Sequence, residues 1–264
     1  MEKILDEYYT VLEKGGFKIL DKVVYKFSGD AINFLNTLTS NNITKERPKN
    51  AFVDRFGKLV VLCDQLVDGE EVYVIFDRRF EDRLREYLSN FLKLGKTRME
   101  KTGLKVAHVI ANDLEKEKIN KLYRMIIDQR IGFLVLSYNI DFLKRLKEIP
   151  EEVYNIIRIE NNISVQGIDF DQEMLLNTNW EEAVSFTKGC FLGQEIIGRV
   201  HNLGKPPKKL VRILYERVPD KITLDGQEIG KISSICYSPK YKKYMAFSMI
   251  PSKTEKIDGG KIIE

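Results

Sequence analysis

The segment from Thr187 to Leu210 contains the densest set of chemically reactive side chains in the sequence. Lys188, Cys190 and Arg199 occur there among four glycines. Glycine permits a positive φ and close approach of the backbone to another group. A cation beside a thiol favours the thiolate, which is the nucleophilic and metal-binding form of cysteine. Cys190 is therefore a candidate nucleophile or a candidate contact to a metal cluster, with Lys188 as its catalytic partner.

Residue chemistry also allows an inert Cys190 buried in a glycine-rich loop, and this is the commoner outcome, because a free cysteine usually behaves as a small hydrophobic residue. His201 follows in the same segment. It could assist Cys190, but a surface histidine in a polar loop explains it equally well. The residues alone leave both alternatives open.

The remaining cysteines and histidines do not suggest a metal centre. Cys63, Cys190 and Cys236 never occur at CxxC spacing, and His108 and His201 are the only histidines. We therefore expect no disulfide framework, no structural zinc site and no self-sufficient iron–sulfur site. Cys63 lies in an apolar stretch and is predicted to be a core residue.

The composition is that of a globular protein of 264 residues and about two domains, with 43% hydrophobic and 31% charged residues. The 43 basic and 39 acidic residues nearly balance, so we expect no direct nucleic-acid partner. We see no apolar run of bilayer length and no signal-peptide core at the start. The interpretation is a cytoplasmic protein without a membrane partner.

Hydrophobic periodicity predicts the elements that position these residues. Helical spacing occurs over residues 2–14, 31–38 and 79–93. Strand patterns occur over 17–27, 52–53, 59–63 and 72–76, and a further strand–helix–strand round is expected over 104–148. This mixed order favours an α+β fold.

The pattern changes after Pro150. A helix is predicted over 153–159, followed by an aperiodic region that ends in the segment 187–207. Short strands are predicted beyond Pro206-Pro207, at 210–215, 222–224, 228–234 and 244–250, with a hairpin turn at Asp225-Gly226. We therefore expect a body over residues 1–204 and a small C-terminal β-barrel over 205–264.

The run Lys188-Gly189-Cys190-Phe191-Leu192-Gly193-Gln194-Glu195 resembles the K-G-C-[FY]-x-G-Q-E signature of the YgfZ-type proteins. These are folate-binding relatives of the glycine cleavage T-protein, an aminomethyltransferase. Arg199 to Pro207 is similar to the continuation of that signature, and Arg55 to Leu59 resembles the family's G-[RK]-[IL] hairpin. The resemblance implies a T-protein-like fold, in which a pterin-holding α+β body surrounds a central hole and a C-terminal barrel closes it.

The resemblance also implies a cofactor, tetrahydrofolate or a related reduced pterin, and a set of residues near it. Lys188 is expected to pair with a carboxylate or with the glutamyl tail of the pterin. The implied cofactor-binding residues are Asp64, Asn177, Arg158, Glu160, Gln194, Glu195 and Arg199. Trp180 is expected either in the core or at the border of the pterin pocket.

Two departures from the family pattern bear on activity. The place of the aspartate that faces the pterin in true aminomethyltransferases holds Leu62, and Asp64 follows two residues later. On a strand Asp64 shares the face of Leu62, so it is a conceivable substitute. The carboxylate place of the family's P-x-E-x-N holds Leu175, leaving Glu173 or Asn177 as acceptors. Both departures weaken the aminomethyl-transfer hypothesis, because that reaction needs a positioned acid or base.

Three functions remain under comparison. The first is a pterin-dependent accessory protein that supports iron–sulfur enzymes and, through them, tRNA modification. The second is an aminomethyltransferase of glycine cleavage with Asp64 as the substitute acid, so that any enzyme activity would be one-carbon transfer. The third is a non-enzymatic scaffold without pterin affinity. Cys190 in its K-G-C context favours the first.

Overall fold

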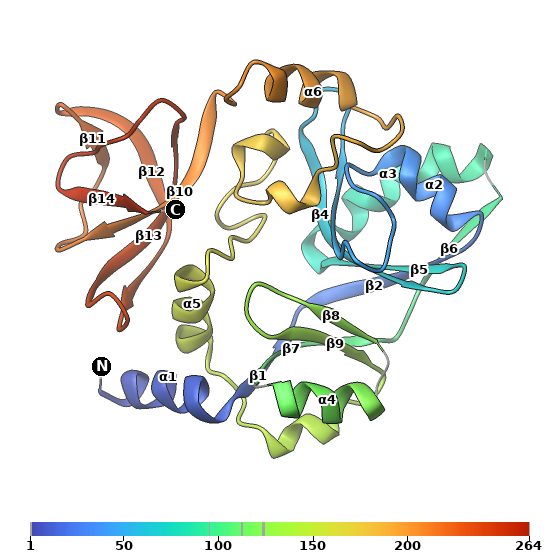
Figure 1. The fold of residues 1–264 in the computed structure, drawn as a ribbon, viewed down its shortest axis with the longest axis horizontal. Helices are drawn as coiled ribbons and strands as arrows, with labels where there is room; N and C mark the ends of the chain where they lie inside the picture. Colours follow the sequence, from blue (N-terminus) through green and yellow to red (C-terminus); the bar gives the residue numbers. More distant parts are fainter. Residues whose placement is uncertain (1, 95, 112, 123–124, 264) are drawn as a thin grey trace.

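The computed structural model describes residues 2–94, 96–111, 113–122 and 125–263 (Figure 1). Three antiparallel sheets organise this part of the chain, and helices cover two of them. The α+β class predicted from the sequence is confirmed. No helix among the described residues is long and apolar enough to cross a bilayer.

The first body sheet has the strand order β3-β4-β5-β2-β6. Its strands are β2 (Lys22–Gly29), β3 (Lys49–Val53), β4 (Leu59–Asp68), β5 (Glu71–Asp77) and β6 (Thr97–Lys101). Helices α2 (Ala31–Leu38) and α3 (Glu81–Leu94), the latter preceded by η1 (Arg78–Phe80), pack on one face of it. Their apolar stripes bury Leu35, Leu84 and Leu88 completely against the sheet, as the predicted amphipathic periodicity requires.

The second body sheet has the order β1-β7-β9-β8. It comprises β1 (Gly16–Leu20), β7 (Lys105–Ile110), β8 (Ile126–Asp128) and β9 (Phe133–Ser137), followed by η2 (Asp141–Arg145), with α4 (Asp113–Leu122) between β7 and β8. The single strand predicted over 17–27 is two strands. It breaks at Asp21 because β1 pairs with β7 in this sheet, whereas β2 pairs with β5 and β6 in the other.

Two helices connect the body to the C-terminal sheet. Helix α1 (Glu2–Lys14) has the predicted bounds and packs against α5 (Glu151–Glu160) through Tyr8 and Val11. Helix α5 in turn contacts the C-terminal sheet. The Tyr8 hydroxyl donates a hydrogen bond of 2.6 Å to Glu160 at the end of α5.

The segment between α5 and the C-terminal sheet contains two short 3₁₀ turns, η3 (Leu175–Asn177) and η4 (Glu181–Ala183), and helix α6 (Gln194–Asn202). The sequence pattern did not predict α6, because glycines interrupt its periodicity. Gly193 precedes it with φ of 84°, and a Cβ there would lie 2.3 Å from the carbonyl oxygen of Asp54. Only glycine fits this start of the helix.

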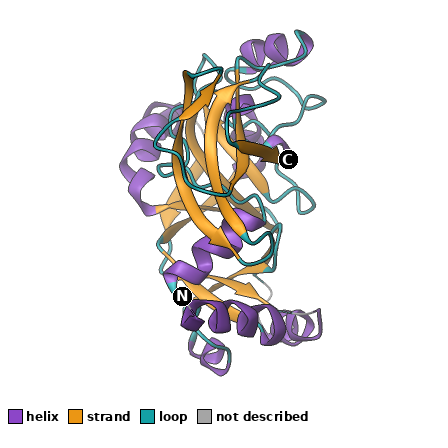
Figure 2. Cartoon of the chain, turned by 90° about the vertical axis from the view of Figure 1, so that its left-hand side faces the viewer, coloured by secondary structure: helices purple, strands orange, loops and turns teal. Residues whose placement is uncertain are grey.

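The C-terminal sheet has the order β11-β12-β13-β10-β14 and curls into a half-barrel (Figure 2). Its strands are β10 (Lys208–Tyr215), β11 (Ile222–Leu224), β12 (Gln227–Ser238), β13 (Lys243–Pro251) and β14 (Gly260–Ile263). The first four strands were predicted, and the four-residue β14 was not. The domain division at residues 204 and 205 stays a prediction.

Candidate functional site

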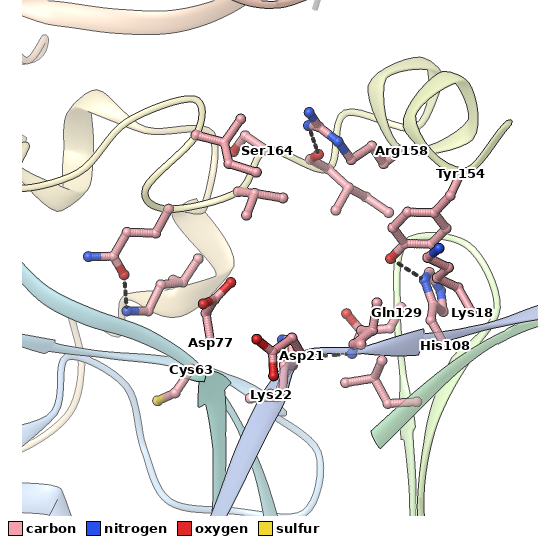
Figure 3. A pocket seen from close by; sticks show the side chains of 18 of the residues that line it. Lys18, Asp21, Lys22, Cys63, Asp77, His108, Gln129, Tyr154, Arg158 and Ser164 are labelled. Atoms are coloured by element: carbon pink, nitrogen blue, oxygen red, sulfur yellow. Dashed lines mark hydrogen bonds and ion pairs between the residues drawn. The ribbon is translucent and has the colours of Figure 1, made fainter. Parts of the chain in front are cut away.

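A cavity of about 390 Å³ lies where the two body sheets meet α5 and the segment 163–168 (Figure 3). Its lining comes mainly from β1, β4, α5 and the segment 163–168, with single residues from β2, β3 and β7 among other elements. Phe80, Tyr154 and Trp180 supply aromatic surface. A flat ring system held by a few oriented polar groups is the kind of ligand that such a cavity accepts.

Asp64 on β4 is a buried polar group of this cavity and is only 1% exposed. Its Oδ2 accepts a hydrogen bond of 2.9 Å from Lys22, and its Oδ1 accepts bonds from Lys49 and, at 3.0 Å, from Gln129. Burial raises the pKa of this carboxyl, but the two ammonium groups outweigh that effect and hold the pKa well below its usual range. Asp64 is therefore ionised with both oxygens occupied, which suits it to hold the lysines and not to transfer protons.

Lys49 stands directly opposite Asp64 in the register of β3 and β4. Burial lowers the pKa of Lys49, and the charge of Asp64 opposes that change. The Lys49 ammonium also lies 4.6 Å from the centre of the Trp180 ring, while Arg130 lies 4.2 Å from the same ring. Trp180, which is 2% exposed, is thus a core residue and a cavity wall at once.

His108 and Tyr154 form the opposite wall (Figure 3). His108 Nε2 lies 2.7 Å from the carbonyl oxygen of Ile131, and Nδ1 lies 2.9 Å from the Tyr154 hydroxyl. Because a carbonyl only accepts, Nε2 carries the proton and Nδ1 accepts from the tyrosine. Burial lowers the pKa of His108 to about 4, so the imidazole is neutral at pH 7.

Arg158 borders the cavity and connects it to the C-terminal sheet. It bonds Asp169 at 2.9 Å and Ser234 of β12 at 2.6 Å. Glu160, which was also expected to bind the cofactor, lies outside the lining and accepts hydrogen bonds from Tyr8 and Ser238. Arg158 and Glu160 therefore hold α1, α5 and the C-terminal sheet together, with Arg158 alone facing the cavity.

The predicted motif loop does not reach the cavity. Lys188 is 9% exposed and donates to the carbonyl oxygens of Thr39 and Asn41 at 2.7 and 2.8 Å. These backbone partners replace the expected carboxylate, because the loop packs against the corner that follows α2. Burial lowers the pKa of Lys188 to about 8. Cys190 is exposed, so its thiol is open to the surface.

The other predicted ligand-contacting residues also lie away from the cavity. Gln194, Glu195 and Arg199 belong to α6, and Asn177 belongs to η3, where its amide donates to Glu173 at 2.9 Å. Leu175 is buried in an apolar cluster. Of the seven predicted cofactor-binding residues, the structure places Asp64 and Arg158 on the cavity wall.

Sequence reasoning missed Lys22, Lys49, Gln129 and Tyr154 as cavity residues. They come from different elements and carry no local motif. The described residues contain no group of three histidines, cysteines or carboxylates arranged to hold a metal ion.

Comparisons with known proteins find similarity to iron–sulfur cluster assembly factors and to aminomethyltransferases. No protein-family model matches the chain. The mitochondrial iron–sulfur cluster assembly factor IBA57 homolog of Mycosarcoma maydis is 33% identical over 88 residues, which are 32% of this chain and 22% of that protein. The aminomethyltransferase of Koribacter versatilis is 23% identical over 270 residues, covering 98% of this chain and 70% of the enzyme.

One solved structure has the same fold as this chain. The crystal structure of the glycine cleavage system aminomethyltransferase T from Bartonella henselae matches with a TM-score of 0.80. The superposition covers 94% of this chain and 81% of that protein at 11% sequence identity. The match to the fungal assembly factor thus spans about a fifth of that protein's length. The matches to the two enzymes span most of their lengths.

Proposed function

Because this chain is a YgfZ-type relative of the glycine cleavage T-protein family, we propose that it is a cytoplasmic accessory protein that depends on a reduced folate or pterin. It binds the pterin in the central cavity and supports iron–sulfur enzymes, and through them tRNA modification. The third hypothesis, a scaffold without pterin affinity, assigns no ligand to the central cavity.

The observation that carries the proposal is the chemistry of the cavity wall. A reduced pterin combines a flat ring with several donors and acceptors along its edges. Phe80, Tyr154 and Trp180 supply the apolar faces, and Lys22 and Lys49 supply donors. The residues present therefore fit the group. Bound there, a tetrahydrofolate supplies a nitrogen pair that can carry a one-carbon unit.

Asp64 argues against aminomethyl transfer by this chain. An acid or base must exchange a proton with the reacting nitrogen. Both oxygens of Asp64 already accept hydrogen bonds from Lys22, Lys49 and Gln129, and its pKa is held low. Leu62, in the place of the family's aspartate, has no proton to exchange. His108 is neutral, and both of its ring nitrogens already have partners.

Cys190 is the residue that we propose acts on a partner. Its thiol is exposed, whereas Cys63 is buried. The loop that contains Cys190 is held in place by Lys188, which donates hydrogen bonds to the backbone carbonyls of Thr39 and Asn41. An exposed thiol of this kind can contact a cluster or a thiol on an iron–sulfur protein.

The test is complementation in a bacterial strain that lacks its own homologue, read as the activity of an iron–sulfur enzyme. The wild-type chain should restore that activity, and Cys190→Ser should not. Cys63→Ser is the control, because that thiol is buried and should not matter for rescue. Full rescue by Cys190→Ser would remove the assigned role of the thiol, and no rescue by the wild type would refute the proposed function.

One observation favours the aminomethyltransferase as a second candidate. The match to a curated aminomethyltransferase covers 98% of this chain, whereas the match to the assembly factor covers 32%. Release of ammonia from an aminomethylated lipoyl carrier protein would establish it, if this release depends on tetrahydrofolate and is lost in an Asp64→Asn variant that circular dichroism shows to be folded.

A further inference from the structure

The charges that line the central cavity do not balance. Six of the lining charges are neutralised in four ion pairs. These pairs are Lys18–Glu151 at 2.9 Å, Asp21–Arg78 at 2.6 Å, Arg79–Asp77 at 2.8 Å and Arg158–Asp169 at 2.9 Å. The remaining set is Lys22, Lys49 and Asp64, in which two ammonium groups share one carboxylate.

No other described carboxylate compensates this excess. Glu182 is near Lys49, but it is bound by Arg130 at 2.7 Å and is 41% exposed. The Trp180 ring over which Lys49 lies offers a favourable face but no negative charge. The cavity wall therefore carries one positive charge more than its partners neutralise.

A net charge in such a place is unfavourable for folding. The side chain of Lys49 is 12% exposed and that of Lys22 is 24% exposed, so water solvates them poorly. One lysine would suffice to pair with Asp64. A second lysine lowers the stability of the ligand-free protein unless another group places a negative charge beside it.

We infer that the ligand of this cavity presents one negatively charged oxygen to the ammonium groups of Lys22 and Lys49. The inference rests on the proposed function, since it concerns the same cavity and deepens the description of its ligand. It makes Asp64 the residue that positions two lysines and makes the lysines the residues that select an anion.

The depth of the cavity places the anion relative to the rest of the ligand. Asp64 and Trp180 are 1% and 2% exposed, whereas Ile19 and Ile168 of the lining are 45% and 47% exposed. The charged oxygen thus lies at the buried end, and the apolar body of the ligand lies toward the two isoleucines.

A reduced folate has two sources of such an oxygen. One is the C4 carbonyl oxygen of the pterin ring, which gains negative charge when the adjacent ring nitrogen loses its proton. The other is a carboxylate of the glutamyl tail. Both offer the same chemistry to the lysines, so fragments of the ligand must distinguish them.

The first experiment asks whether the site selects an anion. Formate and its neutral analogue formamide are titrated at constant ionic strength, with binding read by the fluorescence of Trp180, the single tryptophan of the chain. The variant is Lys22→Met, which leaves Lys49 paired with Asp64 and should fold. The control is Lys26→Met on the same strand, because Lys26 pairs with Glu71 and does not line the cavity.

Formate should bind saturably to the wild type and to Lys26→Met, and formamide should not. Lys22→Met should bind formate about 10- to 100-fold more weakly, the loss expected for one hydrogen bond to a charged group. Equal formate affinities of the wild type and Lys22→Met, or no saturable binding of formate to the wild type, would overturn the inference.

The second experiment assigns the source of the oxygen. Calorimetry compares 6-methyltetrahydropterin, which lacks carboxylates, with p-aminobenzoylglutamate, which lacks the pterin. Whichever fragment Lys22→Met weakens supplies the oxygen. If tetrahydrofolate binds and Lys22→Met weakens neither fragment, the inference fails and the proposed function stands. If formate binds and tetrahydrofolate does not, the proposed function fails and the anion site stands.

Discussion

Asp64→Asn should destabilise the protein far more than its small change in volume suggests. The carboxylate is buried and accepts bonds from Lys22, Lys49 and Gln129. Asparagine keeps the shape but removes the charge, which leaves two partly buried ammonium groups without a counter-ion. Removal of one partner of a buried ion pair typically costs about 3–5 kcal/mol.

That loss is measurable by heat or urea. For a chain of this length, about 3–5 kcal/mol corresponds to a fall in Tm of about 6–10 °C. Lys22→Met provides the comparison, because it leaves one lysine paired with one carboxylate. Its free energy of unfolding should stay within about 1 kcal/mol of the wild-type value.

The stability of Asp64→Asn should also depend on pH. Burial lowers the pKa of Lys49 in the folded protein, and removal of Asp64 removes the charge that opposes this. The folded state then binds fewer protons than the unfolded state, so stability rises with pH toward the ordinary lysine pKa of about 10.4. Asp64→Asn should therefore regain stability between pH 7 and pH 9. An unchanged Tm, or a loss that grows with pH, would refute the account of the cluster.

Three further predictions concern Arg158, Cys190 and the start of α6. Arg158→Met should lower the free energy of unfolding by about 3–5 kcal/mol in urea, because it leaves a buried aspartate unpaired, whereas Arg83→Met, from a solvated ion pair, should cost about 1 kcal/mol or less; equal losses would contradict this. Cys190 in the folded protein should be alkylated by iodoacetamide at a rate similar to that in an unfolded control, as measured by mass spectrometry. Protection of Cys190 until the protein unfolds would show that it is structural. Gly193→Ala should lower Tm, because its Cβ would meet a backbone oxygen, whereas Gly198→Ala, inside α6 with open space around it, should raise Tm slightly; the reverse order would refute the assigned start of α6.

Hydrophobic periodicity predicted the elements in which it is strong. It missed elements that contain glycine or are very short. Helix α1 was predicted at its observed bounds because its apolar residues recur on one face. Helix α6 was missed because Gly193 and Gly198 lower the local helix propensity, while its stability comes from packing of Ile197 in the core. Strands β1 and β2 merged into one prediction, since the switch between sheets at Asp21 depends on partners far away in the chain.

The candidate site was predictable only where a strand's own alternation decides it. Period two placed Asp64 on the face of Leu62, and both line the cavity. Lys22, Lys49 and Gln129 converge on Asp64 through the pairing of separate strands and loops, which no local pattern encodes. The motif around Cys190 pointed to a family resemblance, but it did not locate the cavity.

The most direct test of the central claim is calorimetry of tetrahydrofolate binding to the wild type and to Leu62→Trp. Leu62 lines the cavity, so an indole there should fill the space that the pterin needs. We expect saturable heat for one site in the wild type and its loss in a Leu62→Trp variant that circular dichroism shows to be folded. No heat with the wild type, or equal heat with both proteins, would contradict the proposal that this cavity holds a reduced folate.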